Sequence, residues 1–224
     1  MEKRLKVDFH CHTQYSGDSL TRLEDLARAA QKSGLDRVVI ADHNNLEGAK
    51  RAVDLYPDLF IPGEEILTDR GELLAAFVTE CIPRGLHWME AIERLKKQDA
   101  FISVSHPYDH FRHGWQEKDL SELVEWVDAI EVFNARCYSP RFNHLAGAYA
   151  KRMNLPGTAG SDAHTPGEVG RGYLELPGFS SAEELRAVIR EARVHGRLSP
   201  RWIHLTSTYA KWIKKLRRRK EISP

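Results

Sequence analysis

The chain has 224 residues and a formal net charge of +1, because 33 lysines and arginines nearly balance 32 aspartates and glutamates. This length suits one domain that buries roughly 70% of its unfolded surface, and the balanced charge argues against a polyanion binder by overall composition. We expect no membrane-spanning helix, since no run approaches about 20 apolar residues. The three cysteines lack a CxxC spacing and favour a reducing, cytoplasmic location.

Strand-like and helix-like segments alternate along most of the chain. In the first half, strands are expected at 5–12, 37–42, 59–65 and 72–79, and helices at 21–32 and 46–55. In the second half, strands are expected at 101–105, 129–133 and 158–161, and helices at 88–97, 120–126, 140–152 and 181–193. About seven strands alternating with helices predict a parallel sheet, either as a closed or distorted α/β barrel or as an open doubly wound sheet.

The last part of the chain differs from this alternation. Residues 196–200 are a candidate hinge, so we divide the chain into a barrel over 1–195 and a basic amphipathic helix over 196–224. We expect this helix to pack on the barrel and to leave a basic face in solvent. Contact of the basic end with an RNA backbone or an anionic membrane surface remains an alternative. The apolar residues near one stripe are Trp202, Ile203, Leu205, Tyr209, Trp212, Ile213 and Leu216.

Four short motifs place histidine or aspartate at the end of apolar runs. Side chains alternate along a strand, so His10 and His12 face one side and can chelate one ion. Asp162 and His164 repeat this spacing near the end of the last expected barrel strand. Because strand ends share one rim of a barrel, the motifs together favour a metal centre over separate hydrogen-bonded core histidines. The motifs are D-F-H-C-H (8–12), A-D-H (41–43), S-H-P (105–107) and G-S-D-A-H (160–164).

These motifs, with Y-S-G-D-S (15–19) and P-G-E-E-I (62–66) between them, occur in the order typical of one family. The chain resembles the PHP (polymerase and histidinol phosphatase) family of metal-dependent phosphoesterases over roughly residues 5–176. The resemblance implies a distorted (β/α)7 TIM-like barrel, here with a C-terminal helical extension. It also implies a trinuclear site for two or three divalent ions, which are Mn, Zn or Fe, with Mg as a further option.

The resemblance implies a ligand set by position. Glu65 would bridge the first and second ions, while its neighbour Glu64 points away. Many family members have histidine where Asp18 stands, and Glu72 is the nearest candidate where another histidine is common. An extra carboxylate would favour Mn²⁺ or Fe²⁺ over Zn²⁺, although Glu72 could equally be a strand-edge charge. The implied ligands are His10, His12, Glu65 and Asp162 for the first ion, His106 with Glu65 for the second, and Asp18, His43 and His164 for the third.

The predicted activity is hydrolysis of a phosphate ester by a metal-bound hydroxide, as a phosphomonoesterase or a phosphodiesterase. Arg136, Arg171 and Arg112 are candidates to bind phosphate, because the planar guanidinium matches its oxygens. His110, or His113 beside it, is the candidate to protonate a leaving group. The basic tail favours a nucleotide or short RNA over other phosphorylated small molecules. The alternatives are an amidohydrolase-like metal hydrolase and a non-catalytic module that binds metal or nucleic acid; the oligomeric state is left open.

Overall fold

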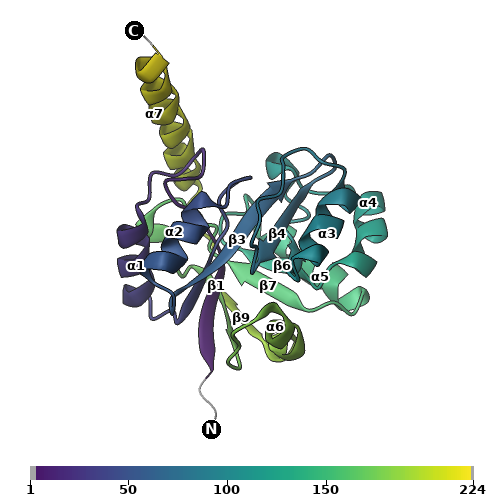
Figure 1. The fold of residues 1–224 in the computed structure, drawn as a ribbon. Helices are drawn as coiled ribbons and strands as arrows, with labels where there is room; N and C mark the ends of the chain where they lie inside the picture. Colours follow the sequence, from purple (N-terminus) through teal and green to yellow (C-terminus); the bar gives the residue numbers. More distant parts are fainter. Residues whose placement is uncertain (1–3, 223–224) are drawn as a thin grey trace.

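The computed structural model describes residues 4–222, with side chains described as far as Arg217. The ends of the two expected units, residues 1–3 and 223–224, lie outside the described residues. Within them, nine strands form one sheet in the order β7-β6-β5-β4-β3-β2-β1-β8-β9 (Figure 1). The strands are β1 (Leu5–Cys11), β2 (Arg37–Ile40), β3 (Phe60–Leu67), β4 (Glu72–Ala76), β5 (Phe101–Val104), β6 (Ala129–Asn134), β7 (Gly157–Gly160), β8 (Gly172–Leu176) and β9 (Arg193–Gly196).

The sheet curls until its first and seventh strands meet. Cys11 and Ala163 form a parallel bridge, and the His12 backbone N–H donates to the Ala163 carbonyl at 2.8 Å. The predicted distorted barrel with a C-terminal helix is therefore confirmed, and the open doubly wound sheet is not observed. Since β1, β2 and β3 run parallel, as do β5, β6 and β7, the carboxyl ends of six strands lie on one rim.

The expectation of a wholly parallel sheet is wrong at β4, which runs antiparallel to both β3 and β5. Only residues 68–71 connect β3 to β4, whereas a parallel crossover needs a dozen residues or more. The reversal has a consequence for the site. It places Glu72, the first residue of β4, opposite Leu67 at the end of β3 and therefore on the same rim.

Helices cover the outside of the barrel (Figure 1). In the first of them, Leu23, Leu26, Ala27 and Ala30 are buried, as their helical spacing predicts. The inside is filled by apolar side chains such as Phe9 and Phe101, whose ring centroids lie 6.3 Å apart. The six helices before the C-terminal one are α1 (Leu23–Lys32), α2 (Glu47–Leu55), α3 (Trp88–Lys97), α4 (Glu117–Leu123), α5 (Pro140–Arg152) and α6 (Ala182–Val188).

Two strands were not predicted. β8 pairs antiparallel with β1, and β9 pairs antiparallel with β8. The helix expected over 181–193 is correspondingly shorter: α6 ends at Val188, and a 3-10 turn leads into β9 at Arg193. Residues 193–196 have little strand propensity of their own. They form a strand because the open edge of β8 offers backbone hydrogen bonds to them.

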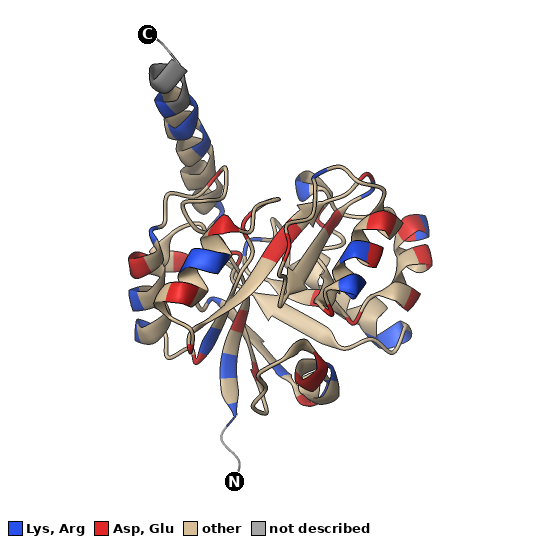
Figure 2. Cartoon of the chain, viewed as in Figure 1, with Lys and Arg blue, Asp and Glu red and all other residues tan. Residues whose placement is uncertain are grey.

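Helix α7 (His204–Ile222) projects away from the barrel, contrary to the expected packing (Figure 1). Ile203 and Ala210 are buried near its start, and polar contacts join it to the rim: Lys214, for example, donates to the Gln14 carbonyl at 2.5 Å. Figure 2 shows basic residues along α7. None of the described helices is long and apolar enough to cross a bilayer. The exposed stripe is Trp202, Leu205, Tyr209, Trp212 and Leu216.

Candidate metal centre

All nine predicted ligands lie together at the rim of strand ends. They come from six of the strands, because each lies on a strand or in the loop that follows it. The reversed β4 contributes the ninth. The residues are His10, His12 and Asp18 from β1 and its loop, His43 after β2, Glu65 on β3, Glu72 on β4, His106 after β5, and Asp162 and His164 after β7.

Glu65 lies at the centre of this cluster. Its Oε2 is 3.2 Å from His10 Nε2 and 3.1 Å from His43 Nδ1. Its Oε1 is 3.1 Å from His106 Nε2, which in turn lies 3.5 Å from Glu72 Oε2. A carboxylate whose two oxygens face imidazoles from three strands is placed to be shared between neighbouring cations.

The outer side of the cluster is built around two aspartates. Asp18 lies 3.3 Å from His43 Nε2 and 3.2 Å from His164 Nε2. The Oδ1 of Asp162 is 3.3 Å from His12 Nε2 and 3.4 Å from His164 Nδ1. Asp162 adopts a positive φ of 53°, in the left-handed region that aspartate tolerates better than most non-glycine residues.

The donor set fits divalent cations. Among the described residues, His10 Nε2, both ring nitrogens of His12 and Glu65 Oε2 are buried without a hydrogen-bond partner, although buried polar atoms are normally paired. Two ligands that share an ion at about 2.0–2.2 Å lie about 3.0–3.5 Å apart. His10 Nε2 and His12 Nε2 lie 3.2 and 3.4 Å from Glu65 Oε2. Three triads have ligand atoms within 4.8 Å of one another: His12, His43 and His164; His10, His12 and Asp162; and His43, Glu65 and Glu72.

The buried carboxylates of the cluster also favour a positive charge beside them. Burial raises the pKa of Glu65, but the imidazoles of His10 and His43 outweigh burial and hold that pKa well below its usual range. Burial lowers the pKa of His43, but Glu65 and Asp18 raise it to about 10. Burial and the charge of Glu65 raise the pKa of Glu72 to about 7. The carboxylates thus attract cations strongly, either as protons on histidine or as bound metal.

Glu131 supports the cluster and was not predicted. Its Oε1 lies 3.0 Å from His10 Nδ1, and its Oε2 accepts from the His106 backbone N–H at 2.8 Å and from Asn134 Nδ2 at 3.1 Å. A carboxylate on the second ring nitrogen fixes the tautomer and orientation of a ligating histidine. The available signal was a single acidic residue within the apolar run of β6.

Replacing Glu131 with glutamine should weaken metal affinity about 10- to 100-fold, because His10 loses the carboxylate that orients it. Competition titration against a chromophoric chelator would measure this change. Glu125→Gln, at an exposed position, is the matched control and should bind metal like the wild type. Equal affinity in both variants would show that Glu131 does not orient the ligand.

Two aspartates of the motifs accept hydrogen bonds from the backbone of neighbouring loops. Asp42 accepts from the Thr13 backbone N–H at 2.6 Å and from its hydroxyl at 2.5 Å. Asp8 accepts from the backbone N–H of Ser161 at 2.9 Å and of Gly170 at 3.0 Å. These bonds tie together the loops that carry the predicted ligands.

A cavity of about 530 Å³ opens over the cluster, and two of the predicted substrate residues line it. Arg112 donates to Asp162 and lies 3.2 Å from Asp109 Oδ2. Arg136 is buried in the wall, where it donates to the Ser207 hydroxyl at 2.8 Å and so ties α7 to the barrel.

The other two predicted substrate or catalytic residues are not in the cavity lining. Arg171 donates to the Leu198 carbonyl at 3.3 Å. His110 is exposed on the loop after β5, whereas His113 does line the cavity. Lys211 of α7 also lines the cavity, 3.5 Å from Asp18, and no sequence pattern linked it to the site.

The chain matches two family models and several curated proteins. The models are described as PHP domain, over residues 8–114, and PHP-associated, over 140–194. The uncharacterized protein MJ0417 of Methanocaldococcus jannaschii is 37% identical over 176 residues, which cover 77% of this chain and 70% of that protein. A protein of Caldicellulosiruptor bescii named probable phosphatase is 24% identical over 200 residues, covering 75% of this chain and 83% of that protein.

Two solved structures share the fold. PsfC from Pseudomonas syringae superposes with a TM-score of 0.71 at 20% identity, covering 94% of this chain and 99% of that one. The lesion-specific endonuclease from Pyrococcus furiosus superposes with a TM-score of 0.64 at 19% identity, covering 85% of this chain and 57% of that one. With the motifs, the barrel and the two matched models in agreement, the chain belongs to the PHP family.

Proposed function

We propose that this protein hydrolyses a phosphate ester at a site that holds two or three divalent ions. The observation that carries the proposal is the position of Glu65, whose two carboxylate oxygens face imidazoles from different strands at one rim. The four carboxylates of the cluster, Asp18, Glu65, Glu72 and Asp162, favour Mn²⁺ or Fe²⁺ over Zn²⁺. Mg²⁺ is a weaker candidate because nitrogen ligands are numerous.

When bound, such ions would lower the pKa of a coordinated water from about 15.7 towards about 7 and stabilise negative charge on a phosphoryl group in transfer. The protein holds the ligand geometry before substrate binds. Glu131 orients His10, and Ser105 donates to Glu65 Oε1 at 2.6 Å. This preorganisation means that little reorganisation is needed during the reaction.

Basic side chains of the cavity would bind the phosphate. Arg112 reaches the cluster from the loop after β5, and Lys211 reaches it from α7. The role predicted for His110, protonation of the leaving group, suits His113 better, because His113 lines the cavity. Arg136 would act on substrate only indirectly, since its guanidinium holds α7 in place.

The relatives support a phosphate ester and leave its identity to experiment. The Caldicellulosiruptor protein is named a phosphatase, and the Pyrococcus neighbour is a lesion-specific endonuclease. A nucleotide or short RNA, as monoester or diester, is therefore our preferred substrate class. We further propose a cytoplasmic location, which the three free cysteines support.

The test is phosphate release from a panel of nucleoside monophosphates, a 3′,5′-bisphosphate, short RNAs and an aryl phosphate. Each reaction would contain Mn²⁺, Mg²⁺, Zn²⁺ or EDTA, and bound metal would be measured by elemental analysis. We expect turnover that requires metal and is lost in EDTA. Metal-loaded protein that hydrolyses amides but none of the phosphates would contradict the proposal.

A further inference from the structure

One side of the cavity is an aromatic wall, made of Phe111, Tyr138 and His204. The rings of Phe111 and Tyr138 lie 5.2 Å apart at 59°, and those of Tyr138 and His204 lie 4.0 Å apart and stack at 7°. The side chain of Phe111 is 76% exposed and faces the cavity without being part of the core. An exposed aromatic ring in the lining of a charged cavity can stack against a planar group of a ligand.

The wall is a built feature of the fold. Its rings come from three separate parts of the chain: the 3-10 turn His110–Arg112, the loop before α5, and the first turn of α7. Arg136 fixes α7 there through the Ser207 hydroxyl and the Ile203 carbonyl, at 2.8 and 3.3 Å. Burial and the charge of Arg136 lower the pKa of His204 to about 4, so its ring is neutral and suited to stacking.

The aromatic wall and the metal centre belong to one cavity. Arg112, next to Phe111 in the sequence, donates to Asp162, so the residue beside the wall contacts a predicted metal ligand. The cavity volume of about 530 Å³ is within the range of roughly 300–1,000 Å³ for small-molecule sites. Its lining also includes polar side chains, among them Asn44, Ser207 and Thr208.

A ligand that uses all of these features has a phosphate, polar hydroxyls and a planar ring. Sugar phosphates and aliphatic amino-alcohol phosphates lack the ring and would leave Phe111 in water, whereas histidinol phosphate has a ring but lacks the sugar hydroxyls. We propose that the substrate is a nucleotide whose base stacks on the aromatic wall while its phosphate reaches the metal centre. This inference rests on the proposed phosphoesterase function and names its substrate class.

The experiment compares two substrates that differ only in the base: adenosine 5′-monophosphate and ribose 5-phosphate. Base stacking on an aromatic side chain should give the nucleotide a kcat/KM roughly 10- to 100-fold higher. Phe111→Ala should lower kcat/KM for the nucleotide about tenfold and leave ribose 5-phosphate within about twofold. Phe111→Tyr, which keeps a ring, should retain the preference. Because Phe111 is exposed, truncation should not disturb the fold.

Calorimetric binding of the same two compounds to the metal-loaded protein separates this inference from the phosphoesterase proposal. If neither compound is hydrolysed, tighter binding of the nucleotide that is lost in Phe111→Ala still supports the wall. Equal turnover and equal binding of the two compounds by the wild type would overturn the inference and leave the phosphoesterase proposal intact. So would a Phe111→Ala variant that affects both compounds equally.

Discussion

Replacing Glu65 with glutamine should lower kcat/KM by at least about 10³-fold and remove part of the bound metal. The carboxylate faces His10, His43 and His106 at 3.1–3.2 Å, so its loss affects more than one ion. Charge stabilisation by such ions contributes several kcal/mol, and each 1.36 kcal/mol corresponds to about tenfold in rate. Turnover at saturating metal, with metal content by elemental analysis, would measure both effects.

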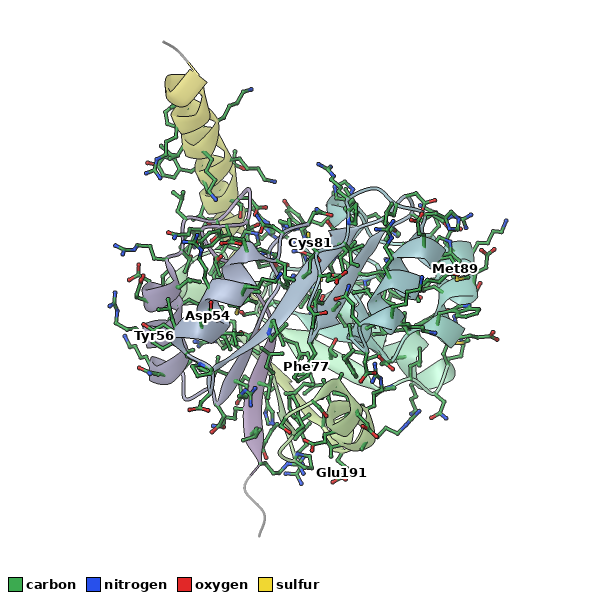
Figure 3. All side chains as sticks on the ribbon, in the orientation of Figure 1. Asp54, Tyr56, Phe77, Cys81, Met89 and Glu191 are labelled. Carbon is green, nitrogen blue, oxygen red and sulfur yellow. The ribbon has the colours of Figure 1, made fainter. Side chains whose placement is uncertain are left out.

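The neighbouring glutamate provides the matched control. Glu64 is also buried on β3, but it accepts from the Ile82 backbone N–H at 3.0 Å and from the Cys81 thiol at 3.1 Å (Cys81 is labelled in Figure 3). Burial raises the pKa of Glu64 to about 7, so near neutral pH the carboxyl is partly protonated and glutamine removes only part of a charge. Glu64→Gln should keep activity and metal content. Loss of activity in both variants, or activity of Glu65→Gln within tenfold of wild type, would contradict the role of Glu65.

The clustering of the predicted metal ligands could be anticipated because the signal of each motif is local. His10 and His12 follow an apolar strand at a chelating spacing, and a barrel brings strand ends to one rim. Glu131 was missed because its role depends on His10, which is 121 residues away in the sequence. The only local signal is an acidic residue within an apolar run. That signal does not indicate a role for Glu131 unless its partner His10 is known.

The errors in the fold have similar causes. An apolar run predicts a buried strand but not its direction, so β4 was assigned to the parallel sheet although its connection of residues 68–71 was too short. The apolar stripe of α7 predicted packing on the barrel. The helix begins at a polar rim, however, and meets Arg136 and Asp18 with Ser207 and Lys211. Of the predicted stripe, Ile203 is buried, whereas most of the other apolar residues are exposed.

Replacing Gly160 with alanine should destabilise the barrel and weaken metal binding together. Gly160 ends β7 where that strand meets β1, and an added Cβ would lie 2.3 Å from His10 Cβ and 2.8 Å from the His10 backbone nitrogen. Forcing an atom into such a site costs about 1–3 kcal/mol. For a chain of this size that lowers Tm by about 2–12 °C. We expect the strain to disturb the positions of His10 and of Asp162, two residues after Gly160, so the metal content should fall in the same variant.

Gly147→Ala distinguishes this local clash from a general effect of replacing glycine. Gly147 lies in α5, and an added Cβ would have no heavy atom within 4 Å. Alanine in a helix interior should leave Tm unchanged or raise it, because glycine there costs about 0.5–1 kcal/mol. Thermal melting and metal content of the two variants are the measurements. A Gly160→Ala protein that melts and binds metal like the wild type would mean that β1 and β7 are not pressed together, and that the barrel is held at this seam by other contacts.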